Sequence, residues 1–121
     1  MVSVRQSVRA WAVELGFSLV DQTKIVTAAS ELARNMIDYG GGGTMTVETL
    51  DDGIRKGLRL LFEDQGPGIA DIQAALRDGF TTGSGMGLGL GGAKRLSNEF
   101  HIHSVAGEGT RIAITRWKGA S

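Results

Sequence analysis

The chain has 121 residues, about the length of one domain, and its 13 basic and 13 acidic residues leave no net charge to attract nucleic acid or an anionic membrane. Cysteine is absent, which excludes disulfides, thiolate zinc sites and a cysteine nucleophile and is typical of a cytoplasmic protein. Since the sequence also lacks an apolar run long enough to span a bilayer, we expect a single cytoplasmic domain over residues 1–121.

Two helices are predicted at the start of the chain. Apolar residues from Val4 to Leu15 recur at helical spacing, and Gly16 follows as a natural C-terminal stop. The second helix is expected to have Asp21 as its N-cap and to end before the glycines at 40–43. Its apolar stripe consists of Ile25, Ala28, Ala29, Leu32, Ala33 and Met36.

Two β-hairpins are predicted to follow, with further helical segments between them. The first hairpin turns at Asp52-Gly53, and the second turns around the glycines at 107 and 109. The four expected strands are Thr44–Leu50, Gly57–Glu63, Glu99–Val105 and Thr110–Trp117. A short helical stretch is expected near 71–76, and a last helix over 88–98. This order predicts an α+β fold, a two-layer sandwich with the helices on one face of a mostly antiparallel sheet.

Glu31 and Asn35 form the first candidate site. They are four residues apart on the second predicted helix, so both project from one side of it. Carboxylate and carboxamide oxygens suit a hard cation such as Mg²⁺, which takes one or two protein ligands together with phosphate oxygens. By itself the pair is more typical of a solvated helix edge with an ordinary polar pair.

The segment from Asp64 to Gly68 forms the second candidate site. Asp64 stands at the end of an apolar strand, where a carboxylate can accept a hydrogen bond from an exocyclic amine such as that of adenine. Gly66 and Gly68 would allow the backbone to pass close to the ring. A strand-to-loop turn is the plainer interpretation of the same residues.

A glycine-rich segment over residues 83–92 forms the third candidate site. Such a loop exposes backbone N–H groups to phosphate oxygens, and a helix follows it. A flexible linker is the plainer alternative. The pattern G-x-G-x-x-G at 87–92 also occurs in Rossmann dinucleotide sites, where it follows a strand within a βαβ unit. Here the pattern follows a loop, and the strands predicted after it form a hairpin, which disfavours a Rossmann site. The P-loop pattern is absent from the sequence. His101 and His103 alternate on a strand, and we expect them to be ordinary surface residues.

Taken in order, these elements resemble the N, G1 and G2 boxes of the GHKL superfamily, the nucleotide-binding fold also called the Bergerat fold. Ser30–Asn35, Glu63–Ile69, Asp78–Phe80 and Lys94–Leu96 resemble in particular the RsbT branch of bacterial switch kinases, over about residues 8–118. That branch normally has a strand ahead of its first helix, and no such strand is recognised here.

The resemblance implies a role for each residue of the site. Asn35 would bind Mg²⁺, and Glu31 would be the general base for the attacking hydroxyl. Asp64 would contact adenine. The remaining nucleotide contacts would come from Gly66 and Gly68 at the base, from Gly85, Gly87, Leu88 and Gly89 at the phosphates, and from Thr110, through water, at adenine.

We therefore expect an ATP-dependent serine/threonine protein kinase that binds ATP, ADP and Mg²⁺. By resemblance its substrate is a STAS-domain protein of the RsbS or RsbR type, and it also activates an RsbU-like phosphatase upstream of a sigma factor. The alternative is a nucleotide-dependent binding module, such as an anti-sigma factor, with little kinase activity. Glu31 favours the enzyme, because a pure binding module has little use for a general base.

Overall fold

The structure is a computed structural model that describes residues 2–69, 72, 76 and 90–119. Within these residues the chain forms two helices, a hairpin, a further helix and a second hairpin. In chain order the elements are α1 (Val2–Glu14), α2 (Leu19–Asp38), β1 (Gly43–Asp51), β2 (Lys56–Asp64), α4 (Leu90–Arg95), β3 (Glu99–Val105) and β4 (Gly109–Trp117).

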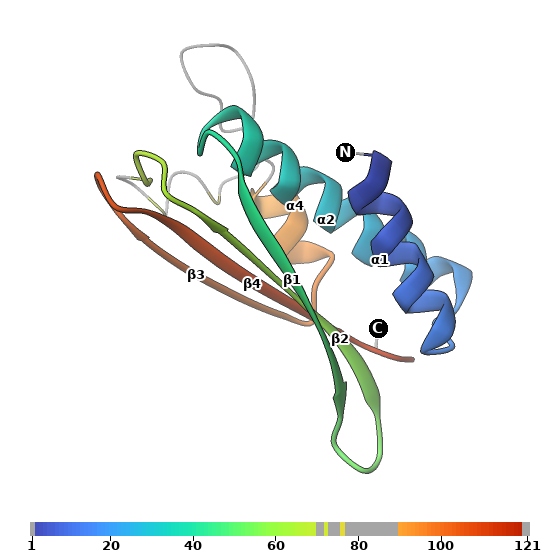
Figure 1. Ribbon diagram of the computed structural model, residues 1–121. Coiled ribbons are helices and arrows are strands. Elements are labelled where there is room, and N and C mark those ends of the chain that lie inside the picture. Colours follow the sequence, from blue (N-terminus) through green and yellow to red (C-terminus); the bar gives the residue numbers. More distant parts are fainter. Residues whose placement is uncertain (1, 70–71, 73–75, 77–89, 120–121) are drawn as a thin grey trace.

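The strands form one sheet in the order β1-β2-β4-β3, and every neighbouring pair is antiparallel. Figure 1 shows the helices on one face of this sheet. The predicted α+β sandwich is therefore confirmed. The register of β2 and β4 pairs Asp64 with Thr110, which brings two of the predicted site residues side by side.

The core lies between the helices and the sheet. Side chains alternate along a strand, so every second residue of β2 and β4 faces the helices. The core consists mainly of buried apolar residues from α1, α2, α4 and the two central strands, β2 and β4. They include Val8, Ala12, Ile25, Ala29, Leu32, Leu58, Leu60, Phe62, Leu90, Ala93, Ile112 and Ile114. Helix α2 supplies the largest share, which agrees with its strong apolar period in the sequence.

The expected cap of α2 was wrong, because Ser18 is the N-cap and not Asp21. Ser18 has an extended backbone (φ −64°, ψ 163°), and its Oγ accepts the Asp21 N–H at 3.1 Å. Serine and aspartate are both good N-caps. Ser18 takes the position because Asp21 is needed elsewhere: its carboxylate lies in a buried ion pair with Arg116.

The last helix ends earlier than predicted, at Arg95. Asn98 cannot continue a helix because it is bound to β4: its N–H donates to the Thr115 carbonyl at 2.8 Å, and its Oδ1 accepts the Trp117 N–H at 2.7 Å. The start predicted at residue 88 lies outside the described residues. Of the expected helix at 71–76, the structure describes Ile72 and Leu76, which are joined by a helical N–H to carbonyl bond of 3.0 Å.

Candidate nucleotide site

The C-terminal end of α2 forms one wall of a cavity. Asn35, Met36 and Tyr39 line it, since residues one turn apart lie on the same face of a helix. The Tyr39 N–H donates to the Asn35 carbonyl at 2.9 Å, so the helix remains regular up to this wall. Asn35 therefore lies where the sequence predicted a polar residue beside a pocket.

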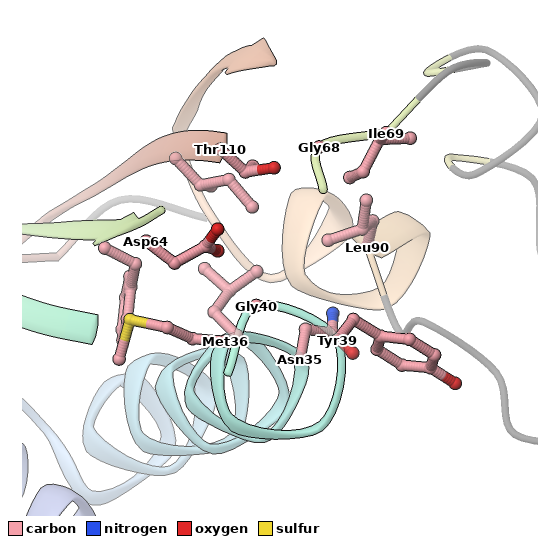
Figure 2. A pocket seen from close by; sticks show the side chains of 12 residues that line it. Asn35, Met36, Tyr39, Gly40, Asp64, Gly68, Ile69, Leu90 and Thr110 are labelled. Carbon is pink, nitrogen blue, oxygen red and sulfur yellow. The ribbon is translucent and has the colours of Figure 1, made fainter. Parts of the chain in front are cut away.

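Asp64 lies at the opposite side of the cavity, at the last position of β2. Figure 2 shows its carboxylate pointing into the cavity between Thr110 and Gly40. The Gly66 N–H donates to Asp64 Oδ1 at 2.9 Å. That bond is the one polar contact of this carboxylate among the described residues, so its other oxygen is available to a donor from outside.

Three glycines allow the backbone to close around Asp64. A Cβ on Gly40 would lie within 3.0 Å of the Asp64 carboxyl group, and one on Gly66 would lie within 3.0 Å of the Gly40 backbone. Gly68 has a positive φ of 77°, and a Cβ there would contact the carbonyl of Val105. Larger residues at these positions would displace the carboxylate or the loop that follows it.

The remainder of the cavity is mostly apolar. Its lining consists of Leu32, Asn35, Met36, Tyr39, Gly40, Phe62, Asp64, Gly68, Ile69, Leu90, Thr110 and Ile112. Its volume is about 40 Å³, far below the roughly 300 Å³ of a pocket that encloses a whole ligand. The cavity can therefore hold one end of a larger ligand, while the rest of that ligand would lie outside it.

Glu31 does not line this cavity. It lies one turn before Asn35 on α2, with its side chain 32% exposed, and the Arg34 Nη1 contacts its Oε1 at 3.5 Å. Its expected role as a general base stays a prediction. Gly85, Gly87, Leu88 and Gly89, expected to bind phosphates, lie outside the described residues.

The structure thus brings Asn35, Asp64, Gly68 and Thr110 together around one cavity, with Gly66 in the adjoining loop. Sequence reasoning missed Gly40 and the apolar lining residues. A signal for Gly40 was present, because a glycine directly after the helix that carries Asn35 is well placed for close approach. The sequence analysis used that glycine run only as a helix stop.

A second polar cluster, also missed, lies at the other end of α2. Arg116 is 2% exposed and Asp21 is 7% exposed. Arg116 donates to Asp21 Oδ1 from Nη2 at 2.9 Å and from Nε at 3.3 Å, and its Nη1 donates to the Leu96 carbonyl at 3.0 Å. Burial alone would raise the pKa of Asp21, but the hydrogen bonds and positive charge of Arg116, assisted by the N–H of Gly119, outweigh it and lower that pKa.

His101 and His103 are exposed on β3, and their side chains alternate with Phe100 and Ile102, which pack on the core. Within the described part of the chain, no group of three or more His, Cys, Asp or Glu side chains is placed to hold a metal ion. None of the described helices is long and apolar enough to cross a membrane.

Comparison with known families identifies the class of this protein. Residues 20–119 match the family described as "Histidine kinase-, DNA gyrase B-, and HSP90-like ATPase", and the chain belongs to that family. The catalytic domain of the histidine kinase ThkA has a similar fold, with a TM-score of 0.58 at 19% identity over 81% of this chain and 68% of the other. The expected GHKL fold is therefore confirmed.

Two relatives place the chain within the family. It is 52% identical to the serine/threonine-protein kinase RsbT of Bacillus subtilis (strain 168), over 97% of this chain and 88% of RsbT. It is 31% identical to the anti-sigma F factor of Bacillus licheniformis, over 93% of this chain and 80% of that protein. The resemblance to the RsbT branch is confirmed, and anti-sigma factors are more distant relatives.

Proposed function

We propose that this chain is an ATP-dependent serine/threonine protein kinase of the RsbT type, working in the cytoplasm as one domain. Its substrate would be a STAS-domain protein of the RsbS or RsbR kind, and it would act as a partner-switching regulator of stress or sigma-factor signalling. The observation that carries the proposal is the Asp64 carboxylate, held in an apolar cavity with one oxygen available. The 52% identity to a kinase supports the reaction.

Recognition of the base would depend on Asp64. An ionised carboxylate only accepts hydrogen bonds, so it suits the exocyclic amine of adenine. Gly40 and Gly66 leave room for this group, and the apolar lining would contact the ring faces. ATP and ADP share the base, so both would bind here, while Gly85, Gly87, Leu88 and Gly89 would hold the phosphates.

A divalent ion would be bound at Asn35. The amide oxygen is a ligand of the kind that Mg²⁺ prefers, and phosphate oxygens and water would complete its coordination. This suits a site without a cluster of acidic or histidine ligands among the described residues. The ion would supply positive charge that offsets the charge on the transferred phosphoryl group.

Glu31 would act as the general base. Its carboxylate would take the proton from a serine or threonine hydroxyl of the partner while the hydroxyl oxygen attacks the γ-phosphorus. The bond between that phosphorus and the β–γ bridging oxygen then breaks, and ADP leaves. Glu31 is partly exposed at the edge of α2, where a partner's side chain could reach it.

A second candidate is a nucleotide-dependent binding module with little kinase activity, such as an anti-sigma factor or an activator of an RsbU-like phosphatase. The anti-sigma F factors among its relatives favour this candidate. The two functions differ in whether Glu31 is needed.

The first test is calorimetric titration with ATP and ADP, each with and without Mg²⁺. A hydrogen bond to a charged group contributes about 1.5 to 3 kcal/mol, so Asp64→Asn should lose roughly 10- to 150-fold in affinity. Glu48→Gln is the matched control, because it removes one negative charge from an exposed position on β1. Equal affinities in wild type and Asp64→Asn would contradict the assignment of the base site.

The second test measures phosphoryl transfer to a STAS-domain protein. Glu31→Ala should keep ATP binding and lose about 10²- to 10⁴-fold in rate, the usual contribution of a general base. Glu48→Ala should retain the wild-type rate. Full activity of Glu31→Ala would rule out its role as base, and absence of transfer by the wild type would favour the binding module.

A further inference from the structure

Thr110 lines the cavity, and its hydroxyl group is hydrogen-bonded to a serine that does not line the cavity. Ser104 on β3 faces Thr110 on β4 as its register partner, and their Oγ and Oγ1 atoms are 2.8 Å apart. Thr110 lines the cavity together with Asp64, its register partner on β2. Ser104 does not line the cavity, so it can act on a ligand only through its neighbours.

Ser104 also connects the β3–β4 hairpin to the loop that follows Asp64. Its Oγ accepts the N–H of Ile69 at 2.7 Å and donates to the Gly109 carbonyl at 3.1 Å. A second bond, from the Gly107 N–H to the Pro67 carbonyl at 2.7 Å, joins the same hairpin to the same loop. The end of the β3–β4 hairpin is therefore attached to this loop at two points, and Ser104 is one of them.

The three contacts of Ser104 determine the direction of the bond to Thr110. A hydroxyl group has one proton and two lone pairs. If that proton goes to the Gly109 carbonyl, the two lone pairs are left for the Ile69 N–H and for the Thr110 hydroxyl. All three contacts can be hydrogen bonds only in this arrangement. Thr110 must then donate to Ser104, and its own oxygen presents only lone pairs to the cavity.

We propose that Ser104 is a positioning residue that makes the cavity selective for a purine with an amine at its 6-position. Asp64 and Thr110 would then both present acceptors to that position. An amine has two protons to donate there, whereas an oxo group would place its own lone pairs against those acceptors. This inference rests on the proposed nucleotide site and adds how the site distinguishes bases.

The test compares ATP with ITP, which carries an oxo group in place of the 6-amine. Affinities would be measured for wild type, Ser104→Ala, Thr110→Val and the double variant. We expect the wild type to prefer ATP, and Ser104→Ala to reduce the ATP-to-ITP preference by about 3- to 10-fold, the effect of one neutral hydrogen bond. When Thr110 is already valine, adding Ser104→Ala should alter the ATP-to-ITP preference by less than about 2-fold.

Two further variants separate selectivity from folding. Ser104→Thr keeps a hydroxyl and should retain most of the preference. Ser97→Ala removes a half-buried hydroxyl that does not line the cavity and that donates to the Ala93 carbonyl at 2.8 Å. This variant should leave the ATP-to-ITP preference unchanged.

An unchanged ATP-to-ITP preference in Ser104→Ala, with wild-type ATP binding intact, would overturn this inference alone. The same holds if the effects of Ser104→Ala and Thr110→Val on the preference are additive. A wild type that binds neither nucleotide would overturn the proposed function as well.

Discussion

A carboxylate lies at each end of α2, and the two carboxylates have opposite environments. At the start of the helix, Asp21 is paired with Arg116, and both are almost completely buried. At the end of the helix, the carboxylate of Asp64 points into a cavity and receives the N–H of Gly66 as its one polar contact among the described residues. Figure 1 shows α2 lying along the face of the sheet that the helices cover.

The difference shows which charges serve the fold and which are available for binding. A buried charge is costly unless it is paired and hydrogen-bonded. Arg116 makes Asp21 part of the structure by joining α2 to β4 and to the chain after α4. Asp64 has no such cation beside it in the described part of the chain, so a ligand donor could complete its hydrogen bonding. Substitutions at the first end should change stability, and those at the second should change binding.

The largest effect is expected for Asp21→Ala. Removing the Asp21 carboxylate takes away the anionic partner of the buried Arg116 guanidinium, and breaking a buried ion pair in this way costs about 3 to 5 kcal/mol of unfolding free energy. Denaturant titration would measure the loss. The double variant Asp21→Leu with Arg116→Met should recover much of the lost stability, because an apolar pair buries no charge. If Asp21→Ala were as stable as wild type, the ion pair would not stabilise the fold, and the proposed difference between the two ends of α2 would be wrong.

A smaller effect, at the other end, is expected for Gly40→Ala. The new Cβ would contact the Asp64 carboxyl group, and overpacking of this kind costs about 1 to 3 kcal/mol. Nucleotide affinity should fall with it, because the carboxylate must move. Gly92→Ala on α4 is the control: its Cβ would meet nothing closer than 3.9 Å, so stability should be retained. Wild-type affinity in Gly40→Ala would show that the carboxylate position is not critical.

The pH dependence of stability offers a third test of the paired end. Because the pKa of Asp21 in the folded protein is lowered below its ordinary value of 3.8, its contribution is fully present above that value. It is lost as the pH falls through the lower, folded-state pKa, with a slope of at most about 1.4 kcal/mol per pH unit for one proton. Asp21→Asn should therefore show a flatter dependence of stability on pH below 3.8, measured by denaturant titration at each pH. Parallel profiles would contradict the lowered pKa.

The smallest effect is expected for Ser18→Ala, which removes the N-cap of α2. The Asp21 N–H would lose its acceptor, and such a loss typically costs about 1 kcal/mol. Thermal unfolding would measure it, with Ser18→Asp, another good N-cap, as the control. If Ser18→Ala were neutral while Ser18→Asp stabilised the protein, the serine would not be an effective cap.

Most of the fold could be predicted because local patterns in this chain agree with the final structure. The strands lie within a residue of their predicted ends, since alternation and glycine turns define both hairpins. Asn35, Asp64 and Thr110, which the resemblance to the GHKL superfamily selected, lie around one cavity, and their roles there stay a prediction. The cap at Ser18 was missed because two adequate caps stand close together, and only the ion pair of Asp21 decides between them.

The sequence by itself determined the layers and the family and selected the residues of the proposed nucleotide site, because periodicity and ordered motifs are local properties. Only the tertiary structure decided the contacts between distant residues. Asp21 and Arg116 are 95 positions apart, and Ile69 and Ser104 are 35 apart. Such pairs leave no local pattern, because their partners become neighbours only when the sheet and the helices pack together.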